Sequence, residues 1–384
     1  MPFLSGRVTF TRLQVSGSSP GIFGPKELEK LEKLSAGRRK IASADGVETG
    51  WTAGDHVLDT RFSLEKNIIN EALLFCLRVD TQKIPAELKR AYYQIELEGM
   101  KSANDGRGPS ARQKREAREA ARERLEAEAK DGRFLKRKVV PVLWDARSNE
   151  LLAATTSGTA LDQLHSLFEQ TFDRNFEPIT AGKRAFDLAE LRGQVRAVDD
   201  ATPTPFVPNV TPNEIAWIAD DENRDFIGNE FLLWLWYVLD AESNTLKLAD
   251  KSEATVMLAQ TLTLECPRGQ TGHETIRSEG PTRLPEAKRA IQSGKWPRKV
   301  GVTLVRHDAQ YDFTLQAETL AVSGAKLPVT DEEQERARLE ARIDQIRQLI
   351  ETLDLVYDAF GRHRFSGEWS KDLPKMQKWL TKSA

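Results

Sequence analysis

A long apolar stripe near residue 350 most constrains how this chain can fold. Seven apolar residues recur there with spacings that alternate between four and three: Leu339, Ile343, Ile346, Ile350, Leu353, Tyr357 and Phe360. The spacing predicts an α-helix that begins after Asp331 and carries one apolar face over about three heptads. Such a helix buries its stripe either against its own domain or in a coiled-coil contact between subunits. The sequence leaves both arrangements open.

Length and composition indicate a soluble protein of more than one domain. The 384 residues suffice for two or three domains, each with its own core. The chain is 39% hydrophobic and 30% charged, and no run approaches the roughly 18 apolar residues of a membrane span. Residues 1–11 lack the apolar core of a signal peptide. Cys76 and Cys266 fit buried strand residues in a reducing compartment, so we expect a cytoplasmic location.

Apolar patterns predict an α+β fold. Strand patterns cover residues 6–15, 68–79, 139–144, 150–155, 254–265, 299–306 and 310–320. Helix patterns cover residues 25–34, 85–100, 110–129, 159–172, 231–239, 285–293 and 371–382, besides the long helix after Asp331. Pro141 would be best placed on an edge strand, because proline cannot donate to a ladder. We therefore expect antiparallel or mixed sheets with packed helices and a long C-terminal helix.

A proline-rich segment predicts the main boundary. Residues 201–212 hold four prolines, which is typical of a linker or an ordered strap. We predict an N-terminal α+β region at residues 1–200, with a basic helical segment at 101–138, and a linker at 201–213. A second α+β region follows at 214–330 and a C-terminal helical region at 331–384.

Charge is distributed unevenly along the chain. Residues 101–138 hold thirteen Lys and Arg against seven Asp and Glu, a local charge of +6 in a chain whose formal net charge is −2. Residues 361–384 hold six basic and two acidic residues, a charge of +4, so the remainder carries −12 (−2 − 6 − 4). Two basic stretches on an acidic body are typical of a protein with a polyanionic partner.

The basic segment sorts its charges by helix face. If Ser110 caps a helix, one face carries the basic residues Lys114, Arg115, Arg118 and Arg122. The adjacent face carries Glu116, Glu119, Glu123 and Glu126. A basic face of this kind neutralises a phosphate backbone. The alternative is a solvated helix on which arginine and glutamate form i,i+4 pairs and bind nothing.

The candidate phosphate contacts lie in both basic stretches. In the first they are Arg112, Lys114, Arg115, Arg118, Arg122, Arg133, Lys136, Arg137 and Lys138, with Arg107 alongside. In the second they are Lys375, Lys378 and Lys382, which share one face of a predicted helix with Lys371, while Leu373, Met376 and Leu380 lie on another face. That second face either contacts phosphate or is merely solvated.

Signatures of catalysis are largely missing from the sequence. It contains no P-loop, no G-x-G-x-x-G after a strand and no G-x-S-x-G elbow. The five histidines are isolated from one another and from the cysteines, so no zinc site and no cofactor are predicted. A metal-dependent nuclease would need converging carboxylates near a lysine. Glu87-Leu88-Lys89 and Asp220-Asp221-Glu222 are the candidates, but the acid-x-Lys form also recurs in two other predicted helices.

The order of features along the chain resembles that of the RdgC family of recombination-associated DNA-binding proteins, which are sometimes labelled exonucleases. The matching features are residues 8–13 (VTFTRL), Gly50-Trp51, residues 83–85 (KIP) before a helix with Lys89, the break at Gly106, the charged helix, residues 132–134 (GRF), Trp144-Asp145, residues 230–236 (EFLLWLW) and closing helices that end in Trp379. The resemblance covers most of the chain.

The resemblance implies a ring-shaped homodimer. Its basic central hole would accept duplex DNA without sequence preference, and the bound protein would restrain RecA filaments. It also implies that Phe134 contributes to the dimer contact, against the alternative that Phe134 is a core residue. The resulting hypothesis is a non-enzymatic, nucleoid-associated DNA-binding protein. A metal-dependent exonuclease and a structural coiled-coil oligomer remain as alternatives.

Overall fold

One strand holds the two halves of the structure together. The computed structural model describes residues 3–38, 46–101, 109–129, 132–207, 215–218, 221–269 and 272–381. Strand β1 (Val8–Val15) pairs through Val8 and Phe10 with β13 (Val322–Lys326), and through its second half with β6 (Glu150–Ala153) and β7 (Phe176–Pro178). The sheets of the two halves are thereby continuous through β1.

The strand order shows how each half extends outward from β1. The order is β10-β9-β11-β12-β13-β1-β6-β5-β4-β2, and all the named pairs are antiparallel. On the N-terminal side lie β2 (Val47–Thr52), β3 (Ile68–Ile69), β4 (Ala72–Gln82) and β5 (Leu135–Asp145). On the C-terminal side lie β8 (Thr245–Lys247), β9 (Glu253–Glu265), β10 (His273–Ser278), β11 (Trp296–Arg306) and β12 (Ala309–Gln316).

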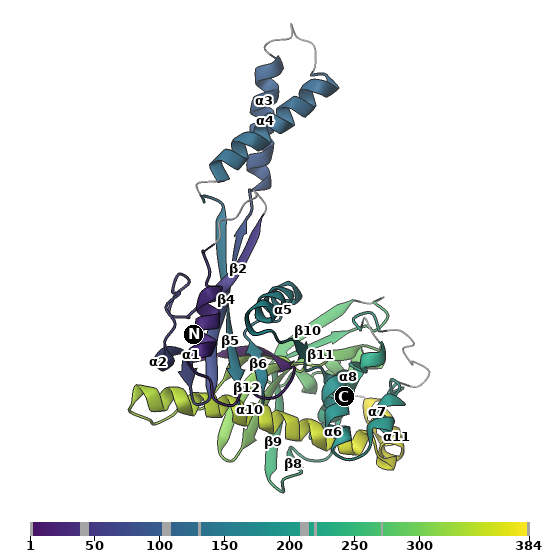
Figure 1. Cartoon of the computed structure of the whole chain (residues 1–384). Helices are drawn as coiled ribbons and strands as arrows, with labels where there is room; N and C mark the ends of the chain where they lie inside the picture. Colours follow the sequence, from purple (N-terminus) through teal and green to yellow (C-terminus); the bar gives the residue numbers. More distant parts are fainter. Residues whose placement is uncertain are drawn as a thin grey trace.

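Helices cover this continuous sheet on both sides (Figure 1). The helices of the N-terminal half are α1 (Pro25–Lys33), α2 (Leu64–Asn67) and α5 (Gly158–Phe172). Those that pack in the C-terminal half are α6 (Ala181–Glu190), α7 (Val195–Asp199), α8 (Phe226–Ala241), α9 (Pro285–Gln292), α10 (Glu335–Arg364) and α11 (Gly367–Thr381). Two short 3-10 turns lie at Asp221–Asn223 and Pro281–Arg283. The predicted α+β class with a long C-terminal helix is confirmed.

Two hydrophobic clusters form the core of the body. The smaller lies between the N-terminal strands and helices α1 and α5, where the Trp144 ring stacks edge-on against Phe168 and Phe172. The larger surrounds α8 and α10 and includes residues from both sides of the proline-rich segment, among them Ala185 and Phe231. The division of the chain into the four predicted regions stays a prediction.

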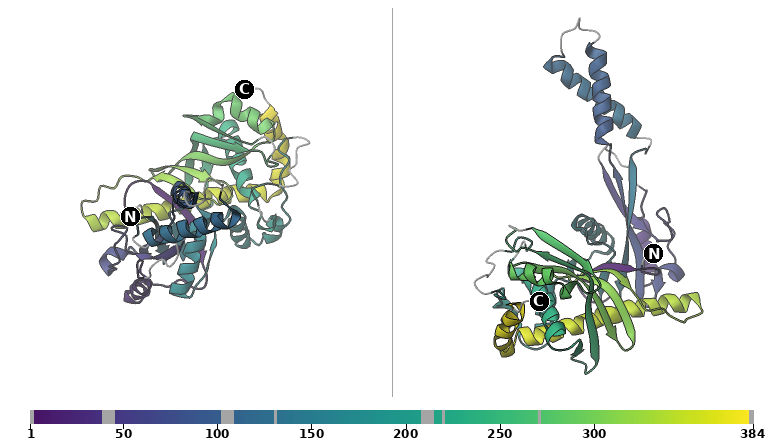
Figure 2. Two further views of the ribbon diagram at one scale, coloured as in Figure 1. Left: turned by 90° about the horizontal axis from the view of Figure 1, so that it is seen from above. Right: turned by 180° about the vertical axis from the view of Figure 1, so that it is seen from behind.

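Helix α10 buries the apolar stripe within its own chain. Ile343, Ile346, Leu353, Tyr357 and Phe360 are each at most 2% exposed and belong to the larger cluster. Three arginines in the first half of the helix donate to the N-terminal half of the structure. Arg336 donates to the carbonyls of Glu65 and Ile68, and Arg342 donates to those of Phe3 and Gly6. Arg347 donates to the Asn70 carbonyl and the Asp145 carboxylate. Helix α10 therefore packs along both halves of the sheet (Figure 2).

A buried ion-pair network crosses the centre of the body. Arg12 on β1 is fully buried, and its guanidinium donates to Glu150 on β6 at 2.9 and 3.0 Å and to Asp354 on α10 at 2.6 and 2.9 Å. Arg184 on α6 donates to the same Asp354 at 2.7 Å. Burial works to lower the pKa of Arg12, but the two carboxylates outweigh it and raise that pKa, so the guanidinium stays charged.

Two local predictions are wrong. Residues 68–79 do not form one strand, because Asn70 and Glu71 adopt φ values of 48° and 62° and turn the chain between β3 and β4. Pro141 does not lie on an edge strand, since β5 lies between β4 and β6. The Pro141 carbonyl accepts a hydrogen bond from the Ala154 N–H, directly after the end of β6. In an extended strand the N–H of a residue points to the same side as its carbonyl, and the β5–β6 ladder has already ended there. Proline at this position therefore removes no ladder bond.

Candidate nucleic-acid interface

A long arm projects from the body and carries the basic segment (Figures 1 and 2). Its stem is the antiparallel ribbon formed by β2, β4 and β5, and its tip is a helical hairpin of α3 (Ala86–Lys101) and α4 (Ala111–Ala129). The ladder between β4 and β5 ends at the pair Gln82 and Leu135. The hairpin is thus inserted where two long strands would otherwise be joined by a turn.

Small residues let the two helices of the tip pack closely. Ala117, Ala121, Leu125 and Ala129 recur every four residues on α4 and are buried, as expected for one helix face packed on a neighbour. Leu125 and Ala129 form a small cluster with Ile84, separate from the two clusters of the body. The tip of the arm therefore has a small core of its own.

The predicted capping of α4 is confirmed. The Ser110 hydroxyl accepts a hydrogen bond from the Gln113 N–H at 3.3 Å, and the Gln113 side chain accepts one from the Ser110 N–H at 2.9 Å. This reciprocal pair satisfies two donors at the helix start. Helix α4 therefore begins directly after the predicted cap residue.

Three of the predicted phosphate contacts on α4 form i,i+4 ion pairs. The distances from arginine Nε to glutamate oxygen are 2.7 Å for Arg112–Glu116, 3.2 Å for Arg115–Glu119 and 2.8 Å for Arg122–Glu126. The side chains of Arg112, Arg115 and Arg122 are 88%, 83% and 80% exposed. The hydrogen bond to Glu116 raises the pKa of Arg112. Pairs this exposed are weak, because both ions are well hydrated, so a phosphate can replace the glutamate.

Aromatic rings on α3 hold two further arginines of α4. The Arg124 guanidinium lies 4.5 Å from the centre of the Tyr92 ring, and the Arg118 guanidinium lies 5.6 Å from that of Tyr93. The Tyr92 hydroxyl contacts Glu128, which raises the pKa of Tyr92. Sequence reasoning did not include Tyr92, Tyr93 and Arg124 in the site. The adjacent tyrosines in a charged helix were the available signal.

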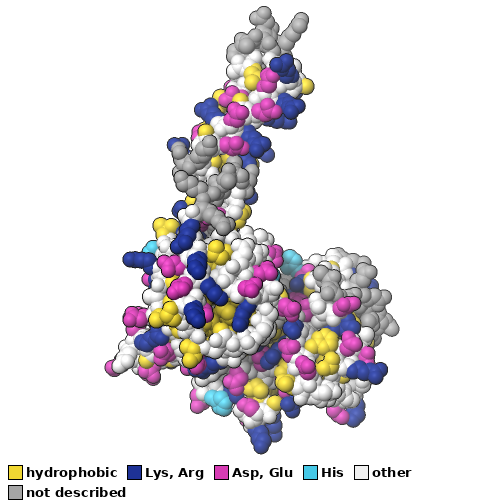
Figure 3. Space-filling view, viewed as in Figure 1, with side chains coloured by type: hydrophobic (Ala, Val, Ile, Leu, Met, Phe, Trp, Pro, Cys, Tyr) yellow, Lys and Arg dark blue, Asp and Glu magenta, His cyan; other side chains and the backbone are white. Residues whose placement is uncertain are grey.

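The stem continues the basic surface toward the body. Lys136, Arg137 and Lys138 are consecutive exposed residues of β5, so they alternate between the two faces of the ribbon. Arg137 lies 3.8 Å from Asp80, whereas in the part of the chain that the structure describes Lys114, Lys136 and Lys138 form no ion pair. Arg133 is exposed at the junction of stem and tip. Figure 3 shows basic side chains interspersed with acidic ones along the arm.

Phe134 lies at the base of the tip. Its half-buried ring packs against the cluster of Ile84, Leu125 and Ala129. Part of the ring remains accessible to solvent, and its contribution to a dimer contact stays a prediction.

The second basic stretch lies far from the arm. Helix α11 packs at the end of the body remote from the tip (Figures 1 and 2). Lys371 pairs with Glu368 at 2.7 Å and Lys375 with Asp372 at 2.6 Å, Lys378 is exposed, and Lys382 lies outside the described residues. The structure places the nine predicted contacts of residues 112–138 along the arm, and it places those on α11 elsewhere.

The described residues offer no constellation for metal chemistry. Among them, no group of three or more His, Cys, Asp and Glu side chains is placed to hold a metal ion. Glu87 and Lys89 lie on α3, and Asp220 lies outside the described residues. No helix among the described residues is long and apolar enough to span a membrane. Comparison with family models and with characterised proteins gave no significant match.

Proposed function

We propose that this protein binds DNA without sequence preference through its arm. The observation that carries the proposal is the run of exposed basic side chains from α4 through Arg133 to Lys136, Arg137 and Lys138, on an element that projects from the body. A projecting element of this kind can approach a duplex without a clash from the body. Lysine and arginine on its surface contact phosphates, which carry no sequence information.

The proposed binding works by ion exchange on both partners. The arginines of α4 release their glutamate partners and take up phosphate oxygens, while the DNA releases condensed counterions. Lys136 and Lys138 form no ion pair within the described residues, so they contact phosphate without first losing a partner. Affinity therefore falls steeply as salt rises, and base identity matters little.

The resemblance to the RdgC family extends this proposal to the assembly. Two copies would enclose the duplex as a homodimer, with Phe134 near the contact between their tips. Bound protein would then block access by a RecA-type recombinase and would be found with the nucleoid. Because α10 covers its apolar stripe within one chain, a coiled coil through that stripe is less favoured than a contact between arms.

Fluorescence anisotropy with a random-sequence duplex tests the proposal. We expect tight binding at low salt that weakens by orders of magnitude between about 50 and 200 mM salt. The triple variant Lys136→Gln, Arg137→Gln, Lys138→Gln should bind about tenfold or more weakly and show a shallower salt slope. The control variant Arg196→Gln, Lys247→Gln, Lys251→Gln removes the same charge from exposed sites on the body and should bind as the unaltered protein does.

The same samples, with Mg²⁺ present, report on the alternatives. DNA of unchanged length on a gel is expected, and shortened DNA would favour the metal-dependent nuclease. Absence of binding at about 150 mM salt, or equal losses in the two triple variants, would refute binding through the arm.

A further inference from the structure

The two faces of the stem carry different charges. In an antiparallel ribbon, directly opposite residues point to the same face and successive residues alternate. Lys138 on β5 lies opposite Val79 on β4, which in turn lies opposite Thr49 on β2. Lys136 lies on the same face, in the next row with Thr81. Among the described residues of β2, β4 and β5, this lysine face carries positive charge and no carboxylate.

The opposite face of the stem holds charges of both signs. Arg137 lies in one row with Asp80 and Glu48. Arg78 donates to Asp80 at 2.7 and 2.8 Å, and Arg137 lies 3.8 Å from the same carboxylate. Two arginines and two carboxylates balance on this face. The net positive charge of the stem therefore lies on the lysine face, with Lys138.

Helix α1 packs on the lysine face of the same sheet. Leu28 and Leu31 of α1 belong to one hydrophobic cluster with the strand residues of that face. After the helix, Ser35 bridges to Trp51 at the edge of β2. Trp51 is two residues from the row that holds Lys138. Three strand spacings and two residues therefore separate the end of α1 from Lys138, roughly 15 Å.

The outward side of α1 presents three lysines. Lys26, Lys30 and Lys33 recur at intervals of four and three, so they fall within an arc of about 60° opposite the buried leucines. All three are exposed, and they form no ion pair within the described residues. Glu29 and Glu32 lie along one flank of this arc. Figure 3 shows Lys and Arg side chains gathered on the body directly below the stem, where Figure 1 places α1.

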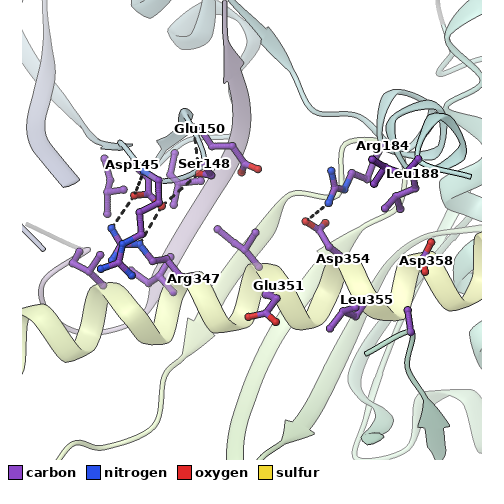
Figure 4. A pocket seen from close by; sticks show the side chains of 18 of the residues that line it. Asp145, Ser148, Glu150, Arg184, Leu188, Arg347, Glu351, Asp354, Leu355 and Asp358 are labelled. Atoms are coloured by element: carbon purple, nitrogen blue, oxygen red, sulfur yellow. Dashed lines mark hydrogen bonds and ion pairs between the residues drawn. The ribbon is translucent and has the colours of Figure 1, made fainter. Parts of the chain in front are cut away.

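Charged residues in a cavity of the body, in contrast, pair with one another. This cavity of about 680 Å³ lies between the β5–β6 corner, α6 and α10 (Figure 4). Five arginines and five carboxylates line it, and they include the pairs Arg347 with Asp145 at 2.8 Å and Arg184 with Asp354 at 2.7 Å. Its lining charges balance, whereas those of the lysine face do not.

We propose that duplex DNA lies along the α1 side of the arm and extends to the lysines of α1. This inference rests on the proposed binding of DNA by the arm, and it assigns the side that faces the duplex and a second contact on the body. Lys136 and Lys138 contact phosphates beside the stem, and the three lysines of α1 contact phosphates further along the same duplex. A duplex carries one charge per about 1.7 Å of its axis, so both groups of lysines meet phosphates. Arg137, on the opposite face, does not contact the duplex.

Two matched variants of neighbouring residues test the side of the stem. Lys138→Gln and Arg137→Gln each remove one positive charge from β5, but on opposite faces. In fluorescence anisotropy with the random duplex at about 150 mM salt, Lys138→Gln should weaken binding about threefold to fivefold and lower the salt slope by about one. Arg137→Gln should change the affinity by less than about twofold, because screening weakens its charge across the ribbon. Equal losses in the two variants would overturn the assigned side.

The contact on α1 is tested by a triple variant, Lys26→Gln, Lys30→Gln, Lys33→Gln. It should bind the duplex about tenfold or more weakly and with a shallower salt slope, because three phosphate contacts are lost. Glutamine keeps the helical propensity of α1, and thermal unfolding checks that the variant is folded. The control that removes three charges elsewhere on the body, Arg196→Gln, Lys247→Gln, Lys251→Gln, should bind as the unaltered protein does.

The outcomes separate this inference from the proposed function. If the unaltered protein binds and the stem variant at residues 136–138 is weakened, while the α1 variant matches the body control, the contact on α1 is overturned and binding through the arm stands. If the unaltered protein does not bind the duplex, both are overturned.

Discussion

One buried charged residue links strand β1 to helix α10 in the body of this protein. Arg12 is a cation in the interior, and such a charge is tolerated only when carboxylates and hydrogen bonds surround it. Glu150 and Asp354 supply both. Because the three residues come from β1, β6 and α10, the pairing specifies how a strand near the start of the chain meets a helix more than 300 residues later.

Asp59 should make stability depend on pH. Burial works to raise its pKa, but hydrogen bonds from Lys66 at 2.7 Å and from the N–H groups of Arg61 and Asp55 outweigh it, so the pKa of Asp59 is lowered. An aspartate with a lowered folded-state pKa stabilises the fold fully above its unfolded pKa of about 3.9, and this contribution is lost as pH falls through the folded value.

Asp59→Asn should therefore destabilise the protein at pH 7 and matter less and less below about pH 4. Urea denaturation of both proteins from pH 7 down to about pH 2, well below the unfolded pKa of aspartate, measures the difference in the free energy of unfolding. A difference that is constant over this range, or that grows as pH falls, would contradict the assigned role.

At the scale of elements, the arginines of α4 form ion pairs within their own helix and still remain accessible to a ligand. Its buried alanines and Leu125 face α3, and its arginines lie on the exposed side beside glutamates. The glutamates compete with phosphate for the same guanidinium groups. They also offset the positive charge of the arm.

Removal of the competing glutamates should strengthen DNA binding. The triple variant Glu116→Gln, Glu119→Gln, Glu126→Gln frees three arginines and removes three negative charges, so we expect affinity for a random duplex to rise about tenfold at about 150 mM salt. Glutamine keeps the helical propensity of the segment. Circular dichroism checks that the helix is retained, and unchanged or weaker binding would show that these arginines do not contact DNA.

Sequence patterns predicted local elements better than their partners. Helix α4, its Ser110 cap and the exposure of its arginines follow from short-range spacing, which a helix converts directly into faces. The turn at Asn70 was missed because an apolar run on both sides hides a change of backbone direction. Strands β2, β8, β10 and β13 were not predicted, since their patterns are weak and pairing partners far along the chain define them.

The cavity was also beyond sequence reasoning. Its lining comes from segments around residues 145, 188, 249 and 350 that only the folded chain brings together. The basic segment, in contrast, is contiguous and could be found from charge alone.

At the scale of the whole molecule, the helical tip of the arm has a hydrophobic cluster of its own. The cluster at Ile84, Leu125 and Ala129 shares no residue with the two body clusters. Gln82 and Leu135 lie directly opposite each other at the end of the stem. The chain could therefore cross from β4 to β5 without the tip.

Replacement of residues 83–134 by Asn-Gly should leave the body folded. This dipeptide forms a two-residue hairpin turn between antiparallel strands, so we expect the melting temperature to change by only about 4–8 °C or less. DNA affinity should fall at least about tenfold because the contacts on α4 and Arg133 are lost. Differential scanning calorimetry and anisotropy measure the two effects, and loss of the cooperative melt would show that the tip is needed for the body to fold.

The position of β1 between two sheets sets the order of events as the protein is synthesised. Its second half can pair with β6 and β7 once residue 178 has been made, but Val8 and Phe10 must wait for β13 at residues 322–326. At ribosomal rates the wait after residue 15 lasts roughly 15–60 s. During that time one strand edge near the start of the nascent chain is open to other polypeptides, so chaperone demand should be greatest before the last strand emerges.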